Sequence, residues 1–324
     1  MIGKYKITVE NEFLKFEFTI KRNITIVRGN SATGKTTLIE MIDGATVEDS
    51  GINLECEKKC VVLSGEKWQR DLRDITDSLV FIDEKDRFVK SDDFARMALG
   101  SDNYFVIVTR EKLSNLPYSV QEVYGIRERG KYAGLAQEYT LNEFYQIYGL
   151  HPMQPFTPDV IIAEDSNSGY DFWNAIAQKN HIVCKSAEGK NKVLRTIRDD
   201  IQMEKNCLAV VDGAAFGPEL EEVLQYIKYK KKNVEIYAPE SFEYLILASG
   251  MWKDSFVKDI CDRTYDYADS VTYVSWERFY TAMLVQITEG TEKKYSKSGL
   301  NAYYLSDRNI ELIMKQVPDV LCGK

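Results

Sequence analysis

Residues 29–36 read Gly29-Asn30-Ser31-Ala32-Thr33-Gly34-Lys35-Thr36. They form a complete G-x-x-x-x-G-K-[ST] pattern, in which glycines let successive backbone N–H groups point at the oxygens of a bound phosphate. The alternating apolar run at 24–27 precedes the pattern, and residues 36–43 read as a helix that ends at Gly44. A strand, a glycine loop and a helix in this order predict a phosphate-binding loop. A glycine-rich turn between a strand and a helix is the plainer alternative.

The side chains of this loop predict a nucleotide and a metal ion. Lys35 should reach the β- and γ-phosphates of ATP, and the Thr36 hydroxyl should bind Mg²⁺. The start of the following helix adds its partial positive charge. The residues expected to contact the nucleotide are Gly29, Asn30, Ser31, Ala32, Thr33, Gly34, Lys35, Thr36 and Thr37. ATP and Mg²⁺ are therefore the predicted cofactors.

An acidic pair after a second apolar run supplies the other half of the predicted site. Residues 79–82 are apolar and are followed by Asp83 and Glu84. Asp83 would join the Mg²⁺ shell, and Glu84 would be catalytic by polarising the attacking water, which makes the domain an ATPase. Another apolar run, 104–108, ends in Thr109-Arg110. Such a strand end often senses the γ-phosphate, but a strand that runs into a solvated loop explains it equally well.

Composition bounds the size and class of the protein. With 324 residues, 44% of them hydrophobic, two globular domains are expected. The six cysteines are scattered, and Cys56 and Cys60 lack the second pair that a zinc site of this type needs. A net charge of −8 argues against a protein that coats nucleic acid broadly, although it allows a local basic groove. Without a signal peptide or a long apolar run, we expect a soluble, cytoplasmic protein with no membrane partner.

A proline-rich stretch marks a domain boundary. Three of the seven prolines fall in residues 151–158, which favours an extended linker between a first domain at 1–150 and a second at 159–324. Before it, residues 123–140 read as a hairpin and 142–148 as a short closing helix. We expect an α/β fold in which the first domain has a parallel sheet.

The second domain reads as alternating strands and helices. Continuous apolar strands separated by helices predict a parallel sheet that is covered on both faces. The expected strands are 160–163, 181–184, 207–211 and 234–237, and the expected helices are 170–178, 190–202 and 218–229. A C-terminal helical extension follows, in which Ser275 is a possible helix cap and 276–287 a core-facing stripe or a dimer surface.

Acidic residues end two of these strands, and their surroundings resemble a Toprim domain. Glu164 follows the first strand, and Asp212 follows the third. The resemblance covers 160–173, Ser186-Ala187-Glu188-Gly189-Lys190 and 210–217. Toprim domains end their first strand in glutamate and a later strand in D-x-D, with a glycine three residues further on, which Glu164, Asp212 and Gly217 match. The second aspartate is replaced by Ala214, and an aspartate that many relatives carry is replaced by Ser168.

A phosphate-loop NTPase domain followed by a Toprim-like domain resembles the OLD-family ATP-dependent nucleases, which often act in anti-phage defence. The resemblance implies an ATP-regulated, metal-dependent nuclease or nucleic-acid effector, with Glu164 and Asp212 as catalytic residues and metal ligands. Glu164 and Asp212 could hold one ion with the help of Asp165, and two metal ions need further acids, for which Glu240 or Glu243 are candidates. DNA or RNA is then the expected partner, and we expect a homo-oligomer.

Three other interpretations stay open. The Toprim-like domain can be catalytically inactive, which would make the chain a nucleotide-switched protein that binds a partner protein. It can also be an unrelated α/β domain in which Glu164 and Asp212 only cap the segments that follow them. A small-molecule kinase is the third interpretation, and the Asp83-Glu84 pair and the long second domain argue against it.

Overall fold

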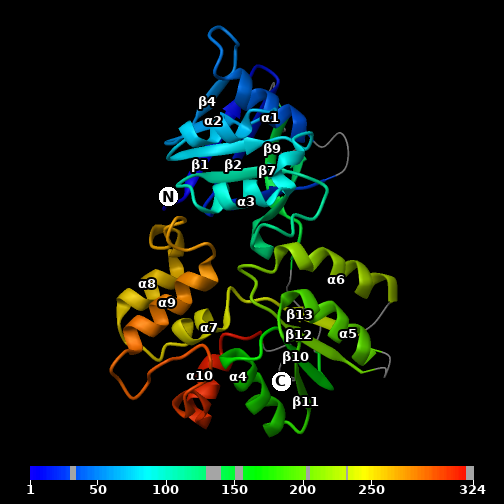
Figure 1. The fold of residues 1–324 in the computed structure, drawn as a ribbon, viewed down its shortest axis with the longest axis vertical. Coiled ribbons are helices and arrows are strands. Elements are labelled where there is room, and N and C mark those ends of the chain that lie inside the picture. Colours follow the sequence, from blue (N-terminus) through cyan, green and yellow to red (C-terminus); the bar gives the residue numbers. More distant parts are fainter. Residues whose placement is uncertain (30–33, 129–139, 150–155, 202–204, 231–232, 319–324) are drawn as a thin grey trace, which may run out of the picture. The chain divides into compact units, whose positions relative to one another are not determined.

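The computed structural model describes residues 1–29, 34–128, 140–149, 156–201, 205–230 and 233–318. The chain forms two compact units (Figure 1). The first unit comprises residues 1–148 and 265–274, and the second comprises 149–264 and 275–324. Most of the linker predicted over 151–158 lies outside the described residues. The α/β class expected from the sequence is confirmed in both units.

The first unit is built on a mixed sheet that has nine strands in the described part of the chain. Their order is β4-β1-β2-β9-β8-β3-β7-β6-β5. The strands are β1 (Tyr5–Glu10), β2 (Leu14–Ile20), β3 (Ile24–Val27), β4 (Asn53–Glu55), β5 (Lys59–Val62), β6 (Ser78–Ile82), β7 (Tyr104–Val108), β8 (Val123–Glu128) and β9 (Thr140–Gln146). The helices are α1 (Lys35–Gly44), α2 (Trp68–Asp74) and α3 (Asp92–Leu99), with short 3-10 turns at η1 (Arg87–Lys90) and η2 (Val120–Glu122).

Only part of this sheet is parallel, so the expectation of a parallel sheet was wrong for the rest. β5, β6, β7, β3 and β8 run parallel to one another. β1 pairs antiparallel with β2 and β4, and β8 pairs antiparallel with β9. β2 alternates buried and more exposed side chains from Phe16 to Ile20, as a strand with a partly solvated face does.

The helix predicted at 142–148 was also wrong, because most of this stretch belongs to β9. β9 lies between β2 and β8 and pairs with both. Phe144 of β9 stacks on Phe18 of β2, with ring centroids 4.2 Å apart and an angle of 7° between the rings. Strand preference depends mainly on such cross-strand packing, which a local reading of the sequence does not contain.

Both faces of the central parallel strands β3, β6 and β7 are buried. Alternate residues of β6 join different cores: Leu79 and Phe81 pack on one face with α1, and Val80 and Ile82 pack on the other. The second face is covered by Trp68 of α2 and Phe94 of α3, among others. A strand buried on both sides has no place for charge along its length, so charged side chains stand where the strands end.

The second unit contains a parallel sheet with the order β11-β10-β12-β13 among its described residues. The strands are β10 (Val160–Ala163), β11 (Val183–Ser186), β12 (Cys207–Val210) and β13 (Val234–Tyr237), and the helices between them are α4 (Ser168–Lys179), α5 (Val193–Ile201, after the 3-10 turn η3, Lys190–Lys192) and α6 (Gly217–Lys230). β11 begins two residues later than expected, because His181 has a φ of 57° and turns the chain after α4.

Right-handed crossovers distribute these helices over the two faces. The connection from β10 to β11 runs in one direction across the sheet, and the connections to β12 and β13 run in the other. α4 therefore covers one face, and α5 and α6 cover the opposite face (Figure 1). Two ring contacts are consistent with this placement of the helices. Trp173 of α4 packs against Tyr237 of β13, and Arg198 of α5 lies over the ring of Tyr226 of α6.

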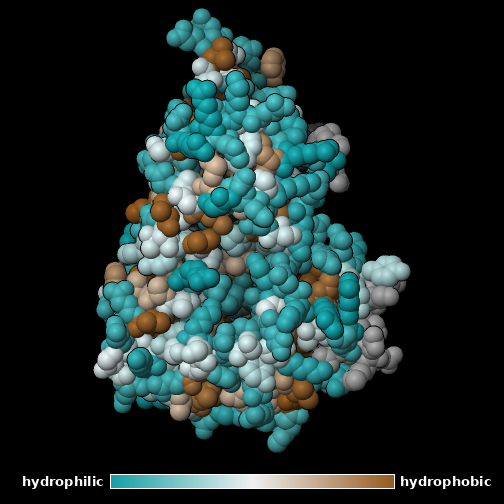
Figure 2. Space-filling model, viewed as in Figure 1, coloured by the Kyte–Doolittle hydropathy of each residue, from teal (hydrophilic) through white to brown (hydrophobic). Residues whose placement is uncertain are grey.

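The C-terminal part of the second unit is helical. It contains α7 (Phe242–Ala248), α8 (Ser255–Asp262), α9 (Trp276–Thr288) and α10 (Asp307–Met314), with 3-10 turns at η4 (Thr264–Asp266), of which residues 265 and 266 belong to the first unit, and η5 (Ala302–Leu305). Ser275 caps α9, as expected, by accepting a hydrogen bond from the Arg278 N–H. In the described part of the chain, no helix combines the length and the apolar character needed to cross a membrane. The face seen in Figure 2 is mostly hydrophilic, with apolar residues in small separate groups.

A buried ion pair in the first unit gives a test of its packing. Glu122 is fully buried, and its Oε1 accepts a hydrogen bond from Arg22 Nε at 3.1 Å, while its Oε2 accepts one from the Tyr124 hydroxyl. Because Glu122→Ala leaves the buried Arg22 guanidinium without this acid, it should lower the free energy of unfolding by ~3–5 kcal/mol in urea denaturation. Glu143→Ala breaks an exposed pair with Arg127 and should cost at most ~1 kcal/mol. Equal costs for the two variants would contradict this account.

Candidate functional site

The predicted phosphate loop joins β3 to α1. Gly29 has a φ of 151° and Gly34 a φ of 82°, and Gly34 is the residue that caps α1. The backbone at Gly34 is left-handed, a conformation that strains residues with a side chain, so the motif's second glycine is required by geometry. Residues 30–33, which include the predicted contacts Asn30, Ser31, Ala32 and Thr33, lie outside the described residues.

Lys35 is the buried cation of this site. Its side chain is only 5% exposed, and its Nζ donates a hydrogen bond to the Gly29 carbonyl at 2.8 Å. Burial lowers the pKa of Lys35, and the nearby Arg110 lowers it further, while Glu84 opposes both. Two cations that repel one another at the N-terminus of a helix favour the binding of an anion between them.

The acidic pair lies at the same edge of the sheet as this loop. β7 is the strand between β3 and β6, so the parallel register brings Arg110, after β7, between Lys35, after β3, and the acids after β6. Arg110 Nε lies 2.9 Å from Glu84 Oε1. Asp83 is buried, and its Oδ1 accepts a hydrogen bond from the Glu84 N–H. The sequence left open whether the end of this strand senses a phosphate or only enters a solvated loop. In the structure, Arg110 pairs with Glu84.

Thr36 and Asp83 are the residues that would hold the Mg²⁺ of a bound nucleotide. The side chain of Thr36 is exposed, that of Thr37 is half-buried, and Asp83 Oδ2 lies 3.8 Å from Lys85 Nζ. Mg²⁺ in nucleotide sites takes one or two protein oxygens and completes its shell with phosphates and water. Two protein oxygens meet that requirement, and the phosphates would supply the remainder.

A second cluster stands at the carboxyl edge of the other sheet. Glu164 follows β10 and Asp212 follows β12, and these neighbouring strands flank the point where the strand order reverses. Ligands of open parallel sheets bind in the crevice at this point. The Asp212 N–H donates a hydrogen bond to Glu164 Oε2 at 2.9 Å, and Asp212 Oδ1 accepts one from the Phe242 N–H. The structure therefore brings together the two acids that the sequence singled out.

Gly213 brings the chain that follows β13 against Asp212. Its N–H donates to the Pro239 carbonyl at 2.6 Å. A Cβ at Gly213 would lie 2.5 Å from the Ala238 carbonyl oxygen and 2.7 Å from that of Pro239, which leaves no room for any side chain. A glycine directly after Asp212 is thus required by close backbone approach.

These acids line a pocket with an empty volume of about 320 Å³, part of it open to solvent. Its lining combines carboxylates with apolar and aromatic groups, as ligand pockets commonly do. The lining residues are Ala163, Glu164, Asp165, Gly169, Trp173, Val210, Val211, Asp212, Pro239, Phe242 and Leu245.

Burial and like charges weaken the acidity of these groups. Burial raises the pKa of Glu164 to about 7. The pKa of Asp212 is raised well above its usual value, first by burial and then by the charges of Glu277, Glu164 and Glu243. Burial also raises the pKa of Asp165, whose Oδ1 accepts a hydrogen bond from the Tyr170 N–H. We call Glu164, Asp165, Asp212, Glu243 and Glu277 the carboxylate cluster.

A lysine that the sequence analysis missed stands among these acids. Lys297 Nζ lies 2.5 Å from Glu277 Oε1 and 3.8 Å from Glu243 Oε1. Burial would lower the pKa of Lys297, but Glu243, Glu277 and Asp212 outweigh that effect and raise it. Lys297 therefore carries a full positive charge that partly neutralises the carboxylate cluster.

Tyr295 and Ser168 hold Glu243 in place. The Tyr295 hydroxyl donates to Glu243 Oε1 at 2.7 Å and lies 2.6 Å from Ser168 Oγ, all of them buried. Glu243 Oε2 is buried without a hydrogen-bond partner among the described residues. Ser168 is thus part of a buried hydrogen-bond chain that leads through Tyr295 to Glu243.

Of the further acids named from the sequence, Asp165 and Glu243 belong to the carboxylate cluster. The Glu240 carbonyl accepts a hydrogen bond from the Ala214 N–H. Ala214 is buried. Lys297, Glu277 and Tyr295 were missed because they lie in a C-terminal region with no motif around them.

The carboxylate cluster does not fit a two-metal centre as it stands. Among the described residues, no three or more His, Cys, Asp or Glu side chains are arranged to hold a metal ion. Glu164 and Asp212 are joined instead by a backbone hydrogen bond, and Lys297 occupies the neighbourhood of Glu243 and Glu277. Lys297 therefore balances part of the negative charge that metal ions would otherwise balance.

The raised pKa of Glu164 predicts a pH-dependent stability. In the unfolded chain this carboxyl ionises near its ordinary 4.5 and in the folded protein near 7, so the folded state binds more protons between these values. The free energy of unfolding should therefore fall as the pH rises from about 4.5 to about 7. Glu164→Gln imitates the protonated form, so it should make the fall shallower and stabilise the protein at pH 8 by ~1–3 kcal/mol. Urea denaturation across pH in EDTA measures this, with the exposed Glu188→Gln as the variant that should keep the wild-type slope.

No model of a known protein family matches this chain, and no curated protein is significantly similar to it in sequence. The function must therefore be inferred from the residues and geometry of the two candidate sites.

Proposed function

We propose that the first unit binds ATP with Mg²⁺ and hydrolyses it. The observation that carries this proposal is the buried Lys35 at the start of α1, held at the carboxyl edge of the sheet beside Arg110 and Glu84. Both described glycines of the motif have the positive φ that a phosphate loop requires. In this site Lys35 and Arg110 bind phosphate oxygens, Thr36 and Asp83 hold Mg²⁺, and Glu84 orients the attacking water.

The pair of Glu84 with Arg110 supports a role for both residues in the proposed hydrolysis. Arg110 neutralises Glu84, and Lys35 is satisfied by the Gly29 carbonyl. A triphosphate offers both cations stronger acceptors than these partners, since charge-assisted bonds to phosphate are among the strongest in proteins. Arg110 would then leave Glu84 free to accept a hydrogen bond from water.

Two variants test the ATPase. Lys35→Ala removes the charge at the phosphates and should weaken the binding of a fluorescent ATP analogue by ~10- to 100-fold. Glu84→Gln should keep the affinity within about threefold and slow hydrolysis by ~100-fold or more, because it removes only the base. Lys6→Ala, an exposed lysine of β1, is the matched control and should change neither. Equal ATP affinity for Lys35→Ala and the wild type would disprove the site.

For the second unit, we propose an effector pocket whose activity depends on the nucleotide state of the first. Its support is the juxtaposition of Glu164, Asp212 and Lys297 beside a pocket at the reversal point of a parallel sheet. Together with the resemblance to OLD-family nucleases, this makes cleavage or binding of nucleic acid the leading activity. The carboxylates would polarise water or bind a cation, and Lys297 would face the phosphate backbone of the substrate.

An inactive second unit is the alternative, and one observation favours it. Lys297 already pairs with Glu243 and Glu277, and the described residues hold no three-ligand metal group. A cluster neutralised in this way needs no metal ion. On this alternative the chain is a nucleotide-switched protein that binds a partner protein.

A nuclease assay separates the two proposals. Plasmid DNA and RNA are incubated with the protein, Mg²⁺ or Mn²⁺, and with or without ATP. On the leading proposal the wild type cuts, Glu164→Ala and Asp212→Ala lose at least ~100-fold in rate, because they remove groups at the reacting centre, and Glu188→Ala, an exposed acid of the same unit, cuts normally. Cleavage by none of the proteins under any condition, together with a stable nucleotide-dependent protein complex, would establish the alternative.

A further inference from the structure

A short segment of the C-terminal half of the chain belongs to the first unit. Residues 265–274, here called the strap, follow α8 and precede α9, two helices of the second unit, yet they pack within the first. Ala268 and Ser270 of the strap are 4% and 5% exposed. The strap is therefore docked on the first unit and is not a loose connection.

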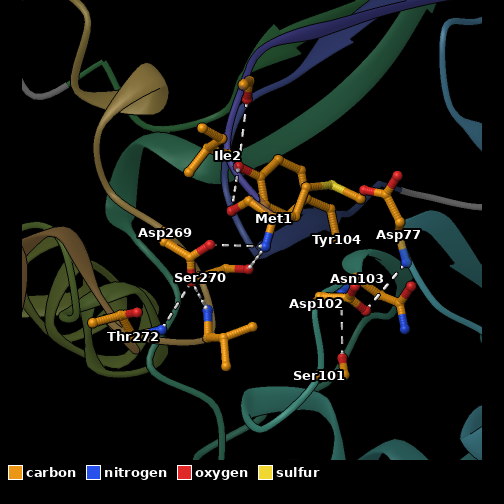
Figure 3. A network of polar contacts seen from close by, with 12 residues as sticks. Met1, Ile2, Asp77, Ser101, Asp102, Asn103, Tyr104, Asp269, Ser270 and Thr272 are labelled. Carbon is orange, nitrogen blue, oxygen red and sulfur yellow. Dashed lines mark hydrogen bonds and ion pairs between the residues drawn. The ribbon is translucent and has the colours of Figure 1, made fainter.

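The strap is bound to the start of the chain by backbone and side-chain hydrogen bonds (Figure 3). The Gly3 N–H donates to the Tyr265 carbonyl at 2.6 Å, and the Ser270 N–H donates to the Met1 carbonyl at 3.0 Å. The Met1 nitrogen in turn bonds Ser270 Oγ at 3.0 Å and Asp269 Oδ2 at 3.4 Å. Asp269 Oδ1 also accepts from the N–H groups of residues 271 and 272, which fixes the turn of the strap itself.

The last residue of the strap is bonded to the beginning of the nucleotide-site strands. Asn23, directly before β3, donates from its side-chain amide to the Val274 carbonyl at 3.0 Å. The Asn23 carbonyl accepts from the Phe105 N–H of β7 at 2.8 Å. β3 leads to the phosphate loop, and β7 leads to Arg110. Asn23 thus joins the strap to the two strands whose opposite ends carry the cations of the nucleotide site.

Both flanks of the strap are attached to α9. On one side, the Thr264 hydroxyl lies 2.6 Å from the Tyr280 hydroxyl of α9. On the other, Ser275 caps α9, whose first turn contains Glu277. Glu277 pairs with Lys297, and its negative charge disfavours the ionised form of Asp212. A displacement of the strap therefore bears directly on the helix that supplies one acid of the carboxylate cluster.

We propose that the strap couples the nucleotide site to the carboxylate cluster. Binding of ATP shifts β3 and β7, Asn23 passes the shift to Val274, and the first turn of α9 moves Glu277 relative to Lys297 and Asp212. The inference rests on the proposed function, in that the first unit must bind ATP. Strands that are close-packed on both faces transmit displacement along their length rather than absorb it.

Hydrogen exchange followed by mass spectrometry tests the coupling without any activity assay. In the wild type, Mg²⁺ with a non-hydrolysable ATP analogue should change the exchange rate of residues 276–288 by about fivefold or more, the low end of typical coupling between sites. Asn23→Ala should bind the analogue as the wild type does and lose this change. Ser270→Ala, which removes another bond of the strap, should reduce it. Thr272→Ala, an exposed strap residue that offers only its backbone N–H, is the matched control and should respond fully.

Binding of the analogue is measured separately, so that each failure has its own meaning. Binding to the wild type with no change in α9 would overturn the coupling and leave the ATP site standing. A full change in exchange rate in both Asn23→Ala and Ser270→Ala would also overturn it. If Asn23→Ala does not fold, the response of Ser270→Ala is the test. Absence of binding to the wild type would disprove the ATP site, and the coupling with it.

Discussion

The constraint on which both units depend is the burial of parallel strands on their two faces. Such a strand is apolar along its length and can place a charged group only where it ends. β3, β6 and β7 in the first unit and β10 and β12 in the second follow this rule. Since parallel strands end at the same edge, their charged ends necessarily meet. Each candidate site is the direct result of a sheet that excludes charge from its interior.

The two sites differ in how the charges gathered in them are compensated. In the first, Lys35 and Arg110 lie close enough to repel one another, and Glu84 pairs with Arg110. In the second, the carboxylates raise one another's pKa and Lys297 balances part of their charge. The proposed anion site thus rests on two neighbouring cations, whereas the carboxylate cluster already contains much of its own counter-charge. This difference makes ATP binding the better supported of the two functions.

The strap changes how the two units should be regarded. A chain that crosses once from one domain to the next leaves them free to act separately. Here the chain returns to the first unit at 265–274 and leaves again at Ser275, where α9 begins. The N-terminal residues, the beginnings of β3 and β7 and the strap share one hydrogen-bonded region. The chain therefore passes between the two units after residues 264 and 274 as well as after residue 148.

By itself the sequence determined the local features of this protein. Strands 24–27, 104–108, 160–163 and 234–237 and the Ser275 cap were predicted correctly, because each depends on neighbouring residues. The acids at 83, 84, 164 and 212 were found for the same reason. Tertiary structure alone decided that β7 lies between β3 and β6, that residues 140–146 form a strand, and that Glu277 and Lys297 lie close enough to Asp212, more than 60 positions before them, to shift its pKa. It also decided that the strap belongs to the first unit. These features depend on contacts between distant segments, and no pattern among sequence neighbours contains them.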